Sequence, residues 1–397
     1  MSKPSSPFGL SLLANHFPAL HGLRVLGILS VIQIHVSFEL GAHRLLPIES
    51  WLYQLSQRIW FGMDMFFFLS GFLIGTILLL PDASGAGGTL KFYARRSFRI
   101  IPAYYVVLTA LALLKPLDPL QRAQLWREYA YVTNYSDVGH VVMMWAWSLC
   151  VEEHFYLLVP LLVALVRRVS SHRARIGALA LLWLSGFGAR FLVSRYQLPS
   201  RPGDGFQLLY IPSHTRYDIL LAGVLLAYLW HTERPRIEGL MARVPVRIAS
   251  VALSALLFGA LVVVPGEALH GAWGLLRIGT VTGLAYLNLI TYLITTRGVA
   301  VKVLGHRSFL VFATLGYGVY LVHMPFVTTV GFVAYLRLAF LYRLPVPFAF
   351  ALAVLAVFFV SLAFGYLLHL LVEKPALYLR DRLVPAKPPA APAPVSA

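Results

Sequence analysis

The sequence has few charged residues, few acidic residues and a single cysteine. Only 12% of the 397 residues are charged, against about 25% in an ordinary soluble domain. Hydrophobic residues make up 59%, and so large an apolar excess requires lipid as its solvent. Cys150 stands alone, which excludes an internal disulfide framework and a cysteine-rich metal site. No other cluster has the usual ligand spacing, so no metal is expected.

The acidic residues are outnumbered by basic ones. Lys and Arg total 33 and Asp and Glu total 16, which gives a formal net charge of +17. In a soluble protein this imbalance would suggest nucleic acid as a partner. Here the basic residues lie in short clusters between apolar segments, as topology signals do. We therefore expect the protein to reside in a lipid bilayer and to bind no nucleic acid.

Apolar segments of spanning or nearly spanning length recur along the chain, and helices are the expected spans because they satisfy their own backbone groups. Basic clusters follow every second segment, whereas 265–272 has no Lys or Arg. This alternation predicts that both termini are cytoplasmic. The sequence thus predicts an all-α integral membrane protein of about ten transmembrane helices. We expect a cytoplasmic segment at 1–18, a transmembrane domain at 19–380 and a disordered Pro/Ala-rich tail at 381–397. The expected spans are 23–40, 58–80, 100–114, 154–166, 176–194, 217–230, 247–265, 273–295, 308–335 and 346–372.

Ionisable residues inside spans are costly and therefore suggest function. The first span carries Arg24 and His35. Eleven helical steps of about 100° return to nearly the same face, about 16 Å further along the axis. Arg24 is expected near the cytoplasmic end and His35 near the external end. A packed histidine with a snorkelling arginine is the structural alternative.

The second span returns inward and carries Asp64. By rise per residue, Asp64 and His35 are expected at similar depths near the outer face. A carboxylate beside an imidazole fixes its tautomer, which a general base needs. A purely structural His–Asp pair is the alternative.

A cluster of arginines precedes the third span. Arg96 and Arg99 are three residues apart and so share a helix face, with Arg95 beside them. Guanidinium groups at a helix N-terminus suit phosphate recognition. Topology alone would also explain these arginines.

Further polar residues are expected toward the external side. Glu152 and Glu153 are adjacent, so they point in different directions and cannot form one acid/base pair. One could face the site while the other ties helices together. Arg216 and Asp218 begin the sixth span on the same side. His323 precedes Pro325 and is a candidate hydrogen-bond donor at a helix kink.

These residues belong to stretches that together resemble the acyltransferase-3 family of bacterial membrane-bound O-acyltransferases over nearly the whole chain. The resemblance implies about ten spanning helices in the bacterial inner (cytoplasmic) membrane. It implies an acyl-CoA donor on the cytoplasmic side, with acetyl-CoA expected, and an acceptor hydroxyl on a carbohydrate, glycan or secondary metabolite. The matching stretches are 19–24 with His35, 64–74, 95–105, 147–156, 215–218, 317–325 and 372–375.

The resemblance also assigns roles to residues of this chain. The family's arginine–ten–histidine motif matches Arg24 and His35, and its paired arginines match Arg96 and Arg99. Two departures are His21, where the family usually has aspartate, and His154, which ends a run that is usually Glu-Glu-Gln. The expected catalytic residues are His35, Asp64 and Glu153; the expected donor-binding residues are Arg24, Arg95, Arg96, Arg99 and Tyr104; the expected acceptor-binding residues are Trp147, Glu152, Tyr156, Arg216, Asp218 and His323.

The expected reaction is acyl transfer with His35 as general base. Covalent transfer through an acyl-histidine remains open as an alternative chemistry. The alternative function is a transporter of a lipid-linked sugar or small polar solute, because buried His, Asp and Arg also line transport paths. The sequence shows no internal repeat, which argues modestly against a transporter.

Overall fold

The computed structural model describes residues 17–79, 85–263 and 271–385. Within these ranges the chain forms helices and no strands, which confirms the all-α prediction. Nine helical stretches there are long and apolar enough to cross a membrane. The sixth expected span, 217–230, is not among these nine; it lies inside a thirty-residue helix, α8, that carries charged residues at both ends.

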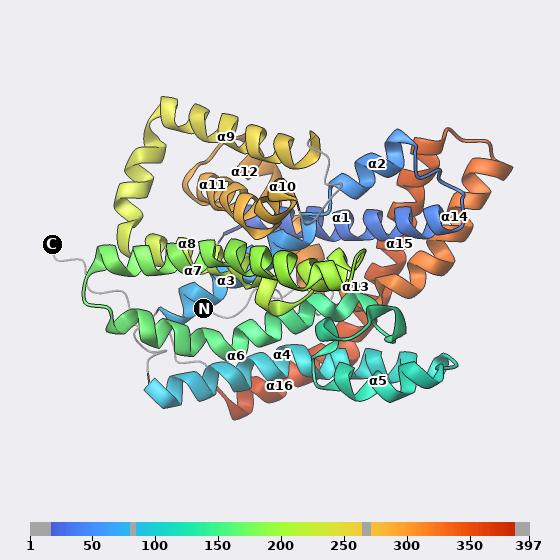
Figure 1. The fold of residues 1–397 in the computed structure, drawn as a ribbon, viewed down its shortest axis with the longest axis horizontal. Helices are drawn as coiled ribbons and strands as arrows, with labels where there is room; N and C mark the ends of the chain where they lie inside the picture. Colours follow the sequence, from blue (N-terminus) through green and yellow to red (C-terminus); the bar gives the residue numbers. More distant parts are fainter. Residues whose placement is uncertain (1–16, 80–84, 264–270, 386–397) are drawn as a thin grey trace.

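The helices form one bundle in which α4, α6, α7 and α8 lie side by side (Figure 1). The short helices α2 and α5 both lie toward the right of Figure 1, α2 in the upper part of the view and α5 in the lower part. The turn from α6 to α7 lies at the opposite end. The helices are α1 Ala19–Ala42, α2 Trp51–Arg58, α3 Gly62–Leu78, α4 Gly85–Leu114, α5 Pro119–Tyr129, α6 Trp147–Arg168, α7 His172–Tyr196, α8 Ser213–Ala242, α9 Val244–Val263, α10 Ala272–Leu276, α11 Thr282–Thr295, α12 Val299–Leu304, α13 Arg307–Phe326, α14 Phe332–Leu336, α15 Val346–Leu368 and α16 Lys374–Leu383.

Helices α3 and α8 form the central pair of the bundle, and glycines let their backbones touch. A Cβ at Gly71 would collide with the backbone of Leu220 in α8. A Cβ at Gly223 would collide in turn with the backbone of Phe68 in α3. Small residues at such crossings are typical of membrane helices, whose association depends on close van der Waals packing. Gly71 and Gly223 therefore serve the close packing of α3 against α8.

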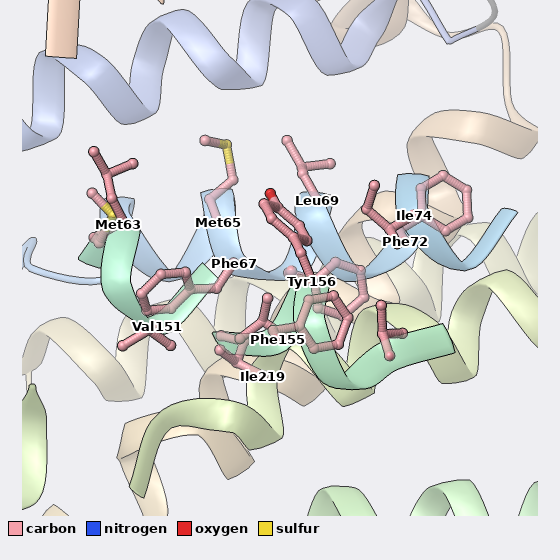
Figure 2. Packing of buried hydrophobic residues seen from close by; sticks show 14 of the residues in the cluster. Met63, Met65, Phe67, Leu69, Phe72, Ile74, Val151, Phe155, Tyr156 and Ile219 are labelled. Carbon is pink, nitrogen blue, oxygen red and sulfur yellow. The ribbon is translucent and has the colours of Figure 1, made fainter. Parts of the chain in front are cut away.

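Figure 2 shows part of the main core, where α3 packs against α6 and α8. Phe67 of α3 lies beside Val151 of α6, whereas Met65 and Leu69 point away from that contact. All four side chains are at least 98% buried. The alternation arises because residues two apart on a helix point to different sides. The core therefore fixes α6, with its acidic residues, against the centre of the bundle.

The outer face of α6 is apolar and exposed. Leu157, Leu158, Leu161 and Leu165 are between 48% and 63% exposed. Their spacing places them on one helical face, and an exposed apolar stripe of this kind suits contact with lipid. This agrees with a helix that packs inward with one face and meets the bilayer with the other.

A buried carboxylate organises the connection between α4 and α6. Glu128 of α5 is fully buried, and its two oxygens accept the backbone N–H groups of Val142 (2.7 Å) and Met143 (2.9 Å). Burial raises the pKa of Glu128, and the two N–H groups act in the opposite direction. The contact holds the segment that leads into Trp145 against α5.

Several boundaries differ from the predicted ones. The expected span at 58–80 is divided, because α2 ends at Arg58 and α3 begins at Gly62. Helix α4 begins at Gly85, well before the expected start at 100. Helix α16 continues to Leu383, past the predicted domain boundary at 380. The rest of the predicted terminal segments, 1–16 and 386–397, lies outside the described residues.

Candidate functional site

Arginines from two helices gather at one end of the bundle. Arg24 of α1 lies within electrostatic range of Arg96 and Arg99 of α4. All three side chains are half-buried, and in the described part of the chain none forms an ion pair with a carboxylate. Like charges held together without partners favour an anionic ligand. The expected grouping of Arg24 with Arg96 and Arg99 is thus present in the structure.

A polar network borders this arginine cluster. Ser70 of α3 donates a hydrogen bond to Glu152 Oε1 (2.7 Å), and the Tyr156 hydroxyl donates to Glu152 Oε2 (3.1 Å). The guanidinium of Arg96 lies over the Tyr156 ring, 5.1 Å from its centroid. Glu152 and Tyr156, expected near the acceptor, therefore lie beside the arginines instead. Their place suggests that they orient the cationic groups.

Two residues expected to bind the donor have other contacts. Arg95 donates to the carbonyl of Val384 (2.6 Å) and pairs with Asp381 of α16 (3.3 Å). Tyr104 is fully buried and donates to the carbonyl of Glu128 (3.0 Å). Arg95 thus ties α4 to α16, and Tyr104 ties α4 to α5.

An imidazole pair lies further along α1. His35 Nδ1 is 2.9 Å from Nε2 of His323 on α13, with the ring centroids 5.0 Å apart. His323 Nδ1 is 2.6 Å from the carbonyl oxygen of Tyr320. His323 is fully buried, whereas His35 is only half-buried. His323 was expected to contact the acceptor; its position behind His35 makes it the group that orients this imidazole.

The predicted pairing of His35 with Asp64 is wrong. Asp64 is fully buried and pairs with Arg216 of α8, and within the described residues His35 has no carboxylate partner. The start of α3 lies against Gly27 of α1. The contact is so close that a Cβ at Gly27 would meet Met65 and the carbonyl of Gly62. His35 lies two helical turns beyond this crossing, about 12 Å along the axis.

A second ion pair completes a buried charge network between α3, α7 and α8. Asp218 lies 2.8 Å from Arg190 Nη1, and both side chains are fully buried. Arg190 also donates to the carbonyls of Leu275 (2.9 Å) and Thr215 (2.8 Å). Arg216 and Asp218, expected to bind the acceptor, thus serve the packing of the bundle. Arg190 was not among the predicted site residues, although an arginine inside an apolar span is a signal of this kind.

The remaining candidates have varied surroundings. Trp147 packs on Phe67 (ring centroids 6.0 Å apart) and Tyr210 (5.2 Å). Glu153 is half-buried, and its Oε1 has no hydrogen-bond partner among the described residues. His154 lies with Nδ1 2.6 Å from the hydroxyl of Ser213. Glu153 is therefore the acidic residue of α6 that keeps a free oxygen.

The histidine that replaces the family's usual aspartate is also without a partner. His21 is 4% exposed, and neither ring nitrogen has a hydrogen-bond partner among the described residues. It lies one turn from Arg24 on α1. Arg24 therefore lacks the carboxylate that an aspartate would supply at this position.

Helix α1 carries two groups of polar residues with different chemistry. One end of the helix brings Arg24 to a set of unpaired guanidinium groups that can hold phosphates. The other end brings the half-exposed His35, held by a second imidazole, which can accept a proton. The arrangement is suited to moving a group from a phosphorylated donor to a hydroxyl.

Comparison with known proteins agrees with this chemistry. OatA of Listeria monocytogenes, named a peptidoglycan O-acetyltransferase, is 26% identical over 346 residues, which are 79% of this chain and 50% of that protein. A Staphylococcus aureus (strain COL) protein provisionally named an O-acetyltransferase is 29% identical over 231 residues, 54% of this chain and 35% of its own length. YrhL of Bacillus subtilis, provisionally named a peptidoglycan O-acetyltransferase, is 28% identical over 237 residues, 55% of this chain and 34% of that protein.

The chain therefore spans between a third and a half of the length of these relatives. No solved structure matches it. The profile of the Acyl_transf_3 family, described as an acyltransferase domain, matches residues 17–370, almost the whole described structure. The chain belongs to the acyltransferase-3 family, as the sequence motifs predicted.

Proposed function

We propose that this protein transfers an acyl group, with acetyl as the expected group, from cytoplasmic acyl-CoA to a hydroxyl of a carbohydrate acceptor, with His35 as the general base. The names of the relatives support acetyl transfer and a glycan such as peptidoglycan as the acceptor. The family membership argues against the transporter alternative. The inner membrane, with the arginine cluster on its cytoplasmic side, is the location that fits this donor.

The hydrogen-bond chain behind His35 carries the proposal. A carbonyl oxygen only accepts, so His323 Nδ1 must carry the proton that points at Tyr320 O. Neutral His323 then has a lone pair on Nε2, and His35 Nδ1 must donate its proton to it. The lone pair of His35 is therefore on Nε2, the ring nitrogen that does not contact His323. A fixed tautomer of this kind is what a general base requires.

The chemical step follows from this tautomer. His35 Nε2 removes the proton of the acceptor hydroxyl while the hydroxyl oxygen attacks the thioester carbonyl. A carbon–oxygen bond forms, the carbon–sulfur bond breaks, and the CoA thiolate leaves. The thiolate then takes the proton from His35 Nε2. The neutral ring of His323 accepts the hydrogen bond of the cationic His35 that exists between these events, at the position that a carboxylate occupies in other triads.

The arginine cluster suits the donor. Acyl-CoA carries several phosphates, and guanidinium groups bind phosphate through charge-assisted hydrogen bonds. Arg24, Arg96 and Arg99 make no ion pair in the described structure, so binding the donor would not require breaking one. Because Arg24 and His35 lie on one helix about 16 Å apart, the long pantetheine arm of CoA can extend between them.

Replacing His35 by alanine tests the proposal. General-base catalysis contributes about 10²- to 10⁴-fold, so His35→Ala should lower acyl transfer by that factor. Transfer is measured as CoA release from acetyl-CoA in the presence of a β-1,4-linked N-acetylglucosamine oligomer, with the purified protein in nanodiscs. His231→Ala, an exposed histidine on α8, is the matched control and should keep its activity. Near-normal turnover in a correctly inserted His35→Ala protein would remove His35 from the mechanism.

A further inference from the structure

We infer that a small cavity beyond the His35–His323 pair binds one sugar ring of the acceptor, with Trp145 as the wall shared by the ring and the histidines. This inference rests on the proposed function and names the acceptor subsite. The cavity has a volume of about 280 Å³. Its wall includes Glu39, Lys115, Gln121, Trp145, Met324 and Pro325.

The cavity lies next to the imidazole pair. Glu39 is four residues after His35 on α1, so it lies on the same face one turn further out. Met324 and Pro325 directly follow His323 on α13. The Trp145 ring packs edge-on against His323, with centroids 6.1 Å apart. A ligand in this cavity therefore lies immediately beyond the proposed base.

Trp145 is held firmly in this position. Its carbonyl oxygen accepts a hydrogen bond from the hydroxyl of Tyr320, and the carbonyl of Tyr320 is the acceptor for His323. Glu128 fixes the preceding residues through Val142 and Met143. The wall of the cavity and the orienting histidine therefore belong to one connected structure.

The polar groups of the cavity match a carbohydrate. Trp145 is only 4% exposed, yet its indole Nε1 has no hydrogen-bond partner among the described residues. A buried N–H normally has a partner, so a ligand oxygen would satisfy it. Glu39 and Gln121 add hydrogen-bonding groups to the wall. Sugars combine hydroxyl groups with an apolar ring face, which suits an indole flanked by polar side chains.

The size and charge of the cavity do not suit the CoA part of the donor. Pockets for drug-sized ligands hold about 300–1,000 Å³, so this cavity suits a single ring. One Lys and one Glu in its wall give no net positive charge, unlike the arginine cluster at the other end. CoA phosphates are therefore not its ligand. A glycan chain would place one ring inside and continue out of the cavity.

The test combines two substitutions with matched controls. Trp145→Phe removes the indole N–H and keeps an aromatic ring, and Glu39→Gln removes the charge. Each should raise the KM for the N-acetylglucosamine oligomer about three- to tenfold, the value of one hydrogen bond, and leave the KM for acetyl-CoA unchanged. The controls are Trp126→Phe and Glu49→Gln, at exposed positions outside the cavity, and neither should change the acceptor KM.

Direct binding separates this inference from the proposed function. Saturation-transfer NMR of the oligomer with the protein in nanodiscs, without acetyl-CoA, should give a signal that Trp145→Phe weakens. If the acceptor KM and this signal are unchanged in both variants while His35→Ala is inactive, the subsite is wrong and the function stands. If Trp145→Phe weakens binding but the wild-type protein transfers no acyl group, the subsite stands and the proposed function fails.

Discussion

The two imidazoles of the His35–His323 pair have different tasks although they are the same residue type. His323 is fully buried, with its Nδ1 bound to the carbonyl of Tyr320. His35 is half-buried and has one nitrogen left for a substrate. In the proposed mechanism, His323 therefore acts through His35 as a positioning residue. Its contribution depends on one atom, Nε2, which must accept a hydrogen bond.

Two amide substitutions can isolate this atom. Glutamine at position 323 can place a carbonyl oxygen where His323 Nε2 lies, whereas asparagine is too short to reach His35. His323→Asn should lower kcat about 10- to 100-fold, as loss of a supporting hydrogen bond does elsewhere, with little change in either KM. His323→Gln should recover most of that loss. The measurement is steady-state CoA release by both variants.

A purely structural role would give a different pattern. Both amides would then reduce the amount of folded protein, and the folded fraction would have normal kcat. Equal kcat losses in His323→Gln and His323→Asn, with normal thermal stability, would show that acceptance of the His35 proton is not what His323 contributes.

The sequence predicted which single residues carry charge into the bundle better than it predicted their partners. The expectation that Arg24 and His35 share one face of a helix follows from the helical period alone. The grouping of Arg24 with Arg96 and Arg99 is present in the structure. The partner of Asp64 did not follow, because counting residues assumed that α1 and α3 begin at the same depth. The close contact at Gly27, which no local pattern reveals, sets their actual offset.

At the level of helices, the α3–α8 crossing determines where the charged side chains can meet. Gly71 and Gly223 allow the two backbones to touch. This approach brings Arg216 of α8 to Asp64 of α3 with both groups fully buried. Separating the helices would expose an unpaired charge to the apolar interior, which is strongly unfavourable. Packing and ion pairing therefore depend on each other here.

Replacing Gly71 by leucine should show this dependence. The added side chain would meet the backbone of Leu220, which cannot rotate away. We expect a loss of stability of at least about 1–3 kcal/mol, the usual cost of overpacking. Gly177→Leu on α7 is the matched control, because a Cβ at Gly177 meets nothing within 4 Å. Thermal unfolding in detergent measures both variants, and equal midpoints would contradict the proposed tight crossing.

The existence of the helices could be predicted from the sequence, but several of their ends could not. Apolar runs locate the spans, but α4 begins 15 residues before the predicted start at 100. The prediction missed this start because the first half of the helix carries Lys91 and the arginines, which interrupt the apolar pattern. These charged side chains are half-buried in the folded protein, so the helix can extend through them. The same reason hid the full length of α8, which starts at Ser213. Tertiary burial, absent from a single sequence, decides such boundaries.

At the level of the whole molecule, the two proposed binding sites are separated by the length of α1. The arginine cluster lies at one end. The cavity, which has no net positive charge and is proposed to bind a sugar ring, lies beyond the imidazoles at the other end. Between them the ion pairs of Asp64 and Asp218 hold α3, α7 and α8 together. In the proposed mechanism, this separation would let a donor and an acceptor approach from opposite sides and meet at His35.

A double substitution in the arginine cluster tests this separation. Arg96→Ala with Arg99→Ala removes two of the cations that face the donor, so the KM for acetyl-CoA should rise by about tenfold or more, because hydrogen bonds between charged groups are strong. The KM for the oligosaccharide should not change. Arg168→Ala, an exposed arginine at the end of α6, is the control and should alter neither constant.

Combining the arginine pair with Trp145→Phe completes the experiment. Substitutions at distant sites without shared partners add in free energy within about 0.5 kcal/mol, so each KM in the triple variant should match its value in the parent that carries the relevant change. The two constants are measured by CoA release at saturating concentration of the other substrate. A rise of the acceptor KM caused by the arginine substitutions alone would mean that the two ends are not independent. An unchanged donor KM would remove the arginines from donor binding.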